Sequence, residues 1–249
     1  MWSEIFASLS VTTLVVLWVG GFVGGIASGA AGFAFGLAAS AIWLHAIAPI
    51  HVAVLVVGGG LAMQSTTIWT LRHSLDARRL WPFVLAGVAG VPVGVWLLVR
   101  TDTGMLKVAI GAFLAAYGVY ALVAPRLPYV VAGRGADAAV GFVAGIMGGL
   151  GGYSGVLPAV WTQLRGWSKT ESRAFYQPFI VAVHVATIAA LGTVALDRKG
   201  LVLLGLALPA MALGTLVGWN LYGRLDEAQF RKIVLILLLV SGAVLVFGR

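Results

Sequence analysis

The chain of 249 residues contains no cysteine and few charged residues. The missing cysteines exclude disulfides, thiolate metal sites and cysteine nucleophiles. Only 10% of the residues are Asp, Glu, Lys or Arg, and none of these occurs in the 67 positions from Ile5 to Leu71. With 61% hydrophobic residues and a mean hydropathy of +1.02, the composition is far from that of a soluble domain. Because a membrane pass takes about 20 residues, the chain is predicted to be an all-α polytopic membrane protein.

Two further function classes find no support in the sequence. It contains no metal-ligand spacing such as H-E-x-x-H and no pairing of a nucleophile with a base, so we expect neither an enzyme nor a cofactor. The net charge of +8 would suggest nucleic-acid binding in a soluble protein. Here the Lys and Arg residues lie in short loops beside apolar segments, where lipid headgroups and the positive-inside rule explain them. The expected partner is the lipid bilayer and not a nucleic acid.

Glycine is abundant, and one glycine-rich segment occurs twice. Gly21–Gly32 aligns with Gly141–Gly152 at an offset of 120, with 7 of 12 positions identical. A second match, of Leu97–Asp102 with Leu221–Asp226, extends the repeat. The sequence therefore predicts an N-terminal transmembrane repeat (1–124), a connecting loop (125–136) and a C-terminal transmembrane repeat (137–249).

The positive charges indicate how the two repeats are oriented. If each repeat has two segments around its glycine motif and three long helices, and the N-terminus is outside, the 16 Lys and Arg residues divide 11 inside to 5 outside. A single crossing at each motif divides them 8 to 8. The positive-inside rule favours the first arrangement, and an odd number of segments inverts the repeats. The predicted fold is two inverted repeats, each of a glycine-tipped helical hairpin plus three long transmembrane helices, with about 8–10 membrane segments in all.

The second glycine motif predicts a re-entrant hairpin. The uncharged stretch 138–164 has 27 residues, too few for two spans of about 20 residues. We expect one half-helix to about Met147, a tip at Gly148–Gly152 and a second half-helix over 153–163, with the tip bordering a cavity. Free amides at the start of the second half-helix, at the positive end of its dipole, favour an anion site. The alternative is that the glycines only allow close helix packing.

A polar stripe follows this motif in the chain. Arg173, Gln177 and His184 have a spacing that places them on one face of a helix. Ionisable groups inside a span are functional by default. A guanidinium suits an oxyanion, although Arg173 could instead snorkel to the lipid headgroups. His184 is a candidate for coupling to protons or for interhelical hydrogen bonding. The positions that correspond in the first half are Ala53, Val57 and Gln64.

The glycine pattern also resembles that of a known family. It reads Gly141-x-x-x-Gly145-Ile146-x-Gly148-x-x-Gly151-Gly152, with Pro158 after it. The turn Trp167-Ser168-Lys169 then precedes Arg173-Ala174-Phe175-Tyr176-Gln177. With the first glycine copy ending at Gly32, nearly the whole chain resembles the sulfite exporter TauE/SafE family of membrane transporters. The resemblance implies transport of sulfite, sulfonates or related small organosulfur anions across a bacterial inner membrane. The first copy departs from the family's consecutive glycines at Ala30 and Ala31.

We therefore predict a multi-pass inner-membrane secondary transporter that exports small sulfur-containing oxyanions by alternating access at a midplane site. A passive anion channel and a transporter of non-sulfur organic anions are the alternatives. A homodimer and a proton as coupling ion are left open. The second tip, which Arg173 follows in the chain, is favoured for binding, and His184 is the candidate coupling residue. The candidate substrate-binding residues are Ser28, Gly29, Gly32, Gln64, Gly149, Gly151, Gly152, Tyr153, Ser154, Arg173 and Gln177.

Overall fold

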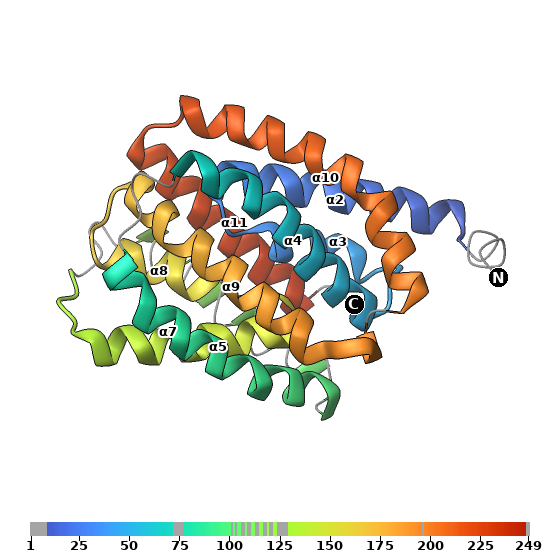
Figure 1. Cartoon of the computed structure of the whole chain (residues 1–249). Helices are drawn as coiled ribbons and strands as arrows, with labels where there is room; N and C mark the ends of the chain where they lie inside the picture. Colours follow the sequence, from blue (N-terminus) through green and yellow to red (C-terminus); the bar gives the residue numbers. More distant parts are fainter. Residues whose placement is uncertain are drawn as a thin grey trace.

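A computed structural model of the chain contains helices and no strands in the part that it describes (Figure 1). It describes residues 9–71, 77–100, 129–195 and 197–247, with short pieces between 102 and 123. The predicted all-α class is confirmed. The helices are α2 (Val11–Ala31), α3 (Phe35–Trp43), α4 (Pro49–Leu71), α5 (Ala77–Arg100), α7 (Arg134–Gly151), α8 (Val156–Leu164), α9 (Lys169–Ala195), α10 (Arg198–Arg224) and α11 (Glu227–Phe247).

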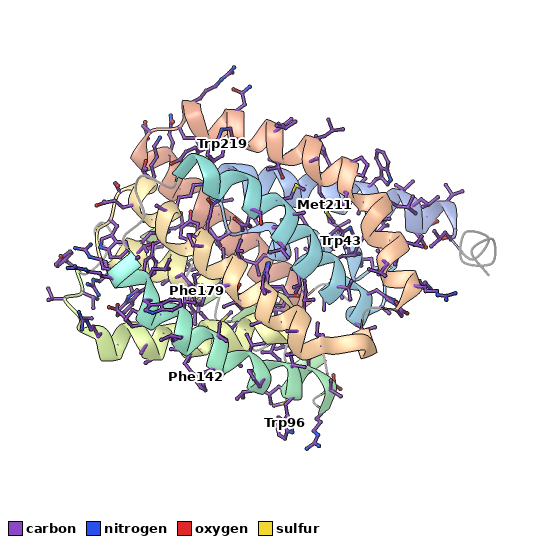
Figure 2. All side chains as sticks on the ribbon, viewed as in Figure 1. Trp43, Trp96, Phe142, Phe179, Met211 and Trp219 are labelled. Atoms are coloured by element: carbon purple, nitrogen blue, oxygen red, sulfur yellow. The ribbon has the colours of Figure 1, made fainter. Side chains whose placement is uncertain are left out.

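Long apolar helices make this a multi-pass membrane protein. Among the described residues, four helices are long and apolar enough to cross a membrane: Val11–Ala31, Ala77–Arg100, Lys169–Gly192 and Arg198–Arg224. Large apolar side chains also cover the outer surface. Figure 2 shows Trp96 and Phe142 at the outside of the bundle, whereas Trp43, Phe179 and Met211 are buried. An apolar exterior around an apolar core requires lipid as the surrounding solvent.

Each half of the chain packs its glycine helix against a helix of the other half. α2 lies along α10, and α7 lies along α5 (Figure 1). α4 and α9 cross in the middle in opposite directions, because Val54 packs on Leu191 while Gly60, further along α4, meets His184, earlier in α9. In Figure 1, α2, α4 and α10 run one way and α5, α7 and α9 run the other. Helices that the repeat aligns thus run in opposite directions. The inverted repeat and its orientation in the membrane stay predictions.

Glycine lets the paired helices touch backbone to backbone. A Cβ on Gly25 of α2 would overlap the carbonyl oxygen of Met211, and a Cβ on Gly145 of α7 would overlap that of Gly87. In lipid, helix association depends on such close packing, because burying apolar side chains gains little. The packing interpretation of the glycines is therefore right for the helical part of both motifs.

Both hairpins turn at a glycine in the left-handed conformation. Gly32 ends α2 and Gly152 ends α7, each with a φ of 81° that other residues rarely adopt. The Gly152 amide donates to Gly148 O at 2.7 Å, which is the αL cap, and the Tyr153 amide donates to Met147 O at 3.2 Å. The return helices α3 and α8 have nine residues each. At about 1.5 Å per residue they cover roughly half of the bilayer core.

The first arm of the second hairpin is longer than the sequence predicts. The expected end is near Met147, but α7 stays helical through Gly151, and α8 begins only at Val156. The turn is therefore at 152–155. The physical reason is that Gly145 and Gly149 can touch α5 only from a helix, so packing overrides the low helix propensity of glycine.

We expect Gly145→Ala to destabilise the protein by about 1–3 kcal/mol, because the added methyl group has no space against the α5 backbone. Gly205→Ala in α10 is the matched control, since a Cβ there meets nothing within 4 Å. Thermal unfolding in detergent should show a lower midpoint for Gly145→Ala alone. Equal midpoints for the two variants would contradict the packing interpretation.

A polar contact joins the starts of α4 and α10. His51 Nε2 lies 3.0 Å from a carboxylate oxygen of Asp197, whose other oxygen accepts from the Gly200 amide at 2.7 Å and so caps α10. Partial burial alone would raise the pKa of Asp197, but the hydrogen bonds from His51 and Gly200 lower it below its usual 3.8. A lowered pKa stabilises the folded state above pH 3.8, and this contribution is lost as the pH falls through the folded-state pKa.

Asp197→Asn removes the negative charge but keeps the N-cap of α10, because asparagine caps a helix as well as aspartate does. We expect the variant to be less stable than the wild type at neutral pH by up to about 1 kcal/mol, since the carboxylate is half exposed. The difference should shrink as the pH falls below 3.8. Thermal unfolding across pH measures it. A difference that does not change with pH would show that the charge contributes nothing.

Candidate functional site

The tips of the two hairpins meet inside the protein. A Cβ on Gly36 of α3 would lie 3.3 Å from the carbonyl oxygen of Gly152, and a Cβ on Gly155 would lie 2.7 Å from Phe33. The return helices α3 and α8 begin here, and their N-cap residues, Ala34 and Gly155, provide no side-chain cap. The first amides of a helix have no partner within it, and the dipole adds positive charge. Two converging helix starts of this kind favour an anion.

Arg173 joins α9 to the end of the first hairpin's long arm. Its side chain is fully buried, and its guanidinium donates to the carbonyl oxygens of Gly29 at 2.7 Å and Ser28 at 3.2 Å. These carbonyls belong to the last turns of α2, where the helix dipole is negative. The rings of Trp219 and Tyr222 lie 4.6 and 4.2 Å from the guanidinium carbon, within cation–π distance. Arg173 does not reach the lipid headgroups, so the snorkelling alternative is wrong.

Arg173 and Gln177 also present unpartnered polar atoms to the first tip. Arg173 Nε and both amide atoms of Gln177 are buried without a hydrogen-bond partner among the described residues. A Cβ on Gly32 would lie 2.9 Å from Arg173 Nε and 3.1 Å from Gln177 Nε2. Leaving such groups unpaired costs free energy, and in native proteins they commonly indicate a bound water or ligand. They form the polar wall of the first tip.

His184 lies at the second tip. Its Nε2 is 3.3 Å from Gly152 O, and its Nδ1 has no partner in the described part of the chain. A Cβ on Gly60 of α4 would lie 2.6 Å from the His184 ring. Ser154, on the tip itself, is fully buried, and its hydroxyl has no partner among the same residues. His184 therefore links the second tip to α4 of the first half.

Two predicted ligand-binding glycines lie in helix interfaces. A Cβ on Gly29 would overlap the carbonyl oxygen of Thr215 on α10, and a Cβ on Gly149 would lie 2.5 Å from that of Val91 on α5. At both positions the missing side chain lets the backbone of a neighbouring helix approach closely. The turns come three residues later, at Gly32 and Gly152. The sequence could not separate these uses, because glycine serves both.

The other predicted residues lie around the tips. The ring of Tyr153 packs on Gly151 and Gly36. Ser28 contributes its carbonyl oxygen to Arg173. Gln64 is buried in α4, one turn beyond the glycine that meets His184.

Two of the three residues of the polar stripe lie at the first tip, although the sequence favours the second tip for binding. Arg173 and Gln177 follow the second tip in the chain, yet they contact Gly32 of the first. Ala31 and Phe33 of the first hairpin share an apolar core with residues of α5, α7, α8 and α9. The first hairpin thus inserts into the helices that surround the start of α9, which brings Arg173 and Gln177 to its tip.

Three aromatic residues of the site were not predicted from the sequence. Tyr176 donates its hydroxyl to Ala31 O; it follows Arg173 by three positions, and that spacing is the one signal that pointed to it. Trp219 and Tyr222 stack on Arg173 from α10. No local pattern links them to an arginine so far away in the chain.

Broken helices whose ends meet within a bundle of long apolar helices are the architecture of a membrane transporter. A family model described as Sulfite exporter TauE/SafE matches residues 17–245. The chain therefore belongs to the sulfite exporter TauE/SafE family of transporters, and the resemblance inferred from its glycine pattern is confirmed. No curated protein and no solved structure gives a match.

We expect Gly32→Ala to destabilise the protein more than Gly166→Ala. Both glycines have a positive φ, 81° and 66°, so both variants carry backbone strain. Only at Gly32 does the added carbon also press on Arg173 and Gln177, whereas at Gly166 it meets a surface ring of Tyr129 at 3.3 Å. Thermal unfolding in detergent measures the difference. Equal losses of stability would show that Arg173 and Gln177 do not restrict the space beside Gly32.

Proposed function

We propose that the protein is a secondary transporter that exports small sulfur-containing oxyanions across the inner membrane, and that the substrate binds where the two hairpin tips meet. The family supports the chemical class of the substrate. The observation that carries the binding site is the set of buried, unpartnered polar atoms beside Gly32, which are Arg173 Nε and the amide of Gln177. A sulfite or sulfonate oxygen would accept hydrogen bonds from both nitrogens.

The starts of α3 and α8 favour a negative charge at the same place. A buried anion needs compensation, because its desolvation is costly. Here the two uncapped helix starts and the guanidinium of Arg173 provide it. The two terminal nitrogens of Arg173 already donate to carbonyl oxygens of α2, Nη1 to that of Ala30 and Nη2 to those of Ser28 and Gly29. A neutral substrate would gain no electrostatic stabilisation from these positive groups.

Two groups of helices would move against each other during transport. One apolar core includes Trp43 and Met211 and joins α2, α3, α4 and α10. Another includes Phe83 and Phe179 and joins α5, α7, α8 and α9, with further residues from the end of α2, from α3 and from α10. The glycine contacts make α2–α10 and α5–α7 rigid pairs. The first tip, with Phe33, reaches into the second core. Rocking of the two groups at the tips would open the site to one side and then to the other.

His184 is the proposed coupling residue. Its ring lies between the second tip and α4, and its Nδ1 has no partner among the described residues. Protonation there would add a positive charge close to the bound anion. A proton gradient should therefore change the rate of sulfite flux through the wild type. Flux that ignores the gradient and does not saturate would instead favour a passive anion channel.

We expect Gln177→Leu to fold as well as the wild type, because it removes two buried polar atoms that have no partner. Transport should fall about ten- to a hundredfold, the effect of losing one hydrogen bond to a charged ligand. Counterflow of sulfite in proteoliposomes measures the rate, and thermal unfolding measures the fold.

Thr187→Val is the matched control on α9. Thr187 is also buried, but its hydroxyl already donates to Val183 O at 2.8 Å. This variant should transport sulfite at the wild-type rate. If Gln177→Leu also transports at that rate, the substrate does not bind at the first tip.

A further inference from the structure

The two hairpin tips are equivalent in the duplication, and the structure keeps that equivalence in space. At the repeat offset of 120, Gly32 corresponds to Gly152. Around Gly32 the neighbours come from α9. A Cβ there would lie 2.9 Å from Arg173, 3.0 Å from Tyr176 and 3.1 Å from Gln177.

Around Gly152 the neighbours come from the equivalent positions of α4, but their chemistry is different. Val56 corresponds to Tyr176 and Val57 to Gln177, while Ala53 stands where the second half has Arg173. A Cβ on Gly152 would overlap Val56 and lie 3.3 Å from Val57. The exposed fractions of Val56 and Val57 are 0% and 1%, so these methyl groups face protein and not lipid. At these three equivalent positions one tip has a guanidinium, a phenol and an amide, and the other has only aliphatic side chains.

This difference decides where a negative charge can bind. Among the described residues that contact the two tips, Arg173 is the only one with a permanent charge. At the second tip, Ser154 and His184 offer hydrogen bonds, but the valines offer none. An oxyanion against Val56 and Val57 would lose its hydration without a donor from these side chains. An aliphatic group there would gain about fourfold in affinity per methylene.

We propose that the substrate is an organic anion with one oxyanion end and one short apolar end, bound in a fixed orientation. The oxyanion lies beside Gly32, Arg173 and Gln177, and the apolar end lies against Val56 and Val57. The apolar end is short because Val56 packs directly on the second tip. The inference rests on the proposed function, to which it adds the shape and polarity of the substrate. Val57 is then a residue that determines specificity.

Competition in proteoliposome counterflow tests this orientation. The competitors are inorganic sulfite, methanesulfonate, ethanesulfonate and 1,2-ethanedisulfonate. We expect ethanesulfonate to compete about fourfold better than methanesulfonate, the effect of one buried methylene. The disulfonate, which would place a second charge against the valines, should compete at least tenfold more weakly than ethanesulfonate.

Substitutions at Val57 test the residue itself. Val57→Thr keeps the shape of valine, and Val57→Gln copies the chemistry of the first tip. Both should lower the preference for ethanesulfonate over methanesulfonate about fourfold, and Val57→Gln should also improve competition by the disulfonate. Val54→Thr is the matched control, because Val54 is equally buried in α4 but packs on Leu191. It should leave the preference unchanged.

The outcomes separate this inference from the proposed function. If sulfite and sulfonates are transported but the disulfonate competes as well as ethanesulfonate, or if Val57→Thr keeps the wild-type preference, the orientation is wrong and the proposed function stands. If the wild type moves neither sulfite nor any sulfonate, both are wrong.

Discussion

Direct contact between helix backbones holds this molecule together, and the arrangement of the candidate site depends on it. Helices in lipid gain little by burying apolar side chains against one another, so they associate where small residues allow a close approach. Gly25 and Gly145 bring α2 onto α10 and α7 onto α5. Each pair takes one helix from each half of the chain. The hairpin turns that follow α2 and α7 therefore lie in the middle of the protein, where their non-helical backbone is shielded from lipid.

α2 ends inside the protein, and Arg173 compensates the partial negative charge at that end. The last carbonyls of α2 have no partner within the helix and lie at the negative end of its dipole. Arg173 donates to three of them, those of Ser28, Gly29 and Ala30, and it lies between them and the rings of Trp219 and Tyr222. Its Nε is left facing the first tip. One buried cation thus links α9 to α2 and would also bind the proposed anion, so Arg173 variants would change both packing and binding, and Gln177 is the cleaner probe of binding.

The two halves share a backbone plan but not a side-chain chemistry. Opposed hairpins give the molecule two equivalent turns, at Gly32 and Gly152, with the same φ. A site used from both sides of a membrane benefits from such a frame, because the two states can be built from similar contacts. The second half has the amide of Gln177 at the first tip, whereas the first half has the aliphatic Val57 at the equivalent position of the second tip. In the proposed transport cycle, the symmetric frame would allow the movement and the different side chains would recognise the substrate.

The sequence alone determined that lipid surrounds the protein, that the fold is helical, that a glycine-rich segment is duplicated and that two glycine turns are present. Hydropathy, charge counts and residue spacing report these properties locally, without knowledge of how the chain runs in space. The sequence also identified Arg173, Gln177 and His184 as one helix face. Only the tertiary structure decided which glycines turn and which pack, and that Trp219 and Tyr222 contact Arg173. It also decided that Arg173 and Gln177 meet the first tip, whereas His184 meets the second. These are contacts between distant segments, and they exist because backbone packing at glycine brings each hairpin into the other half.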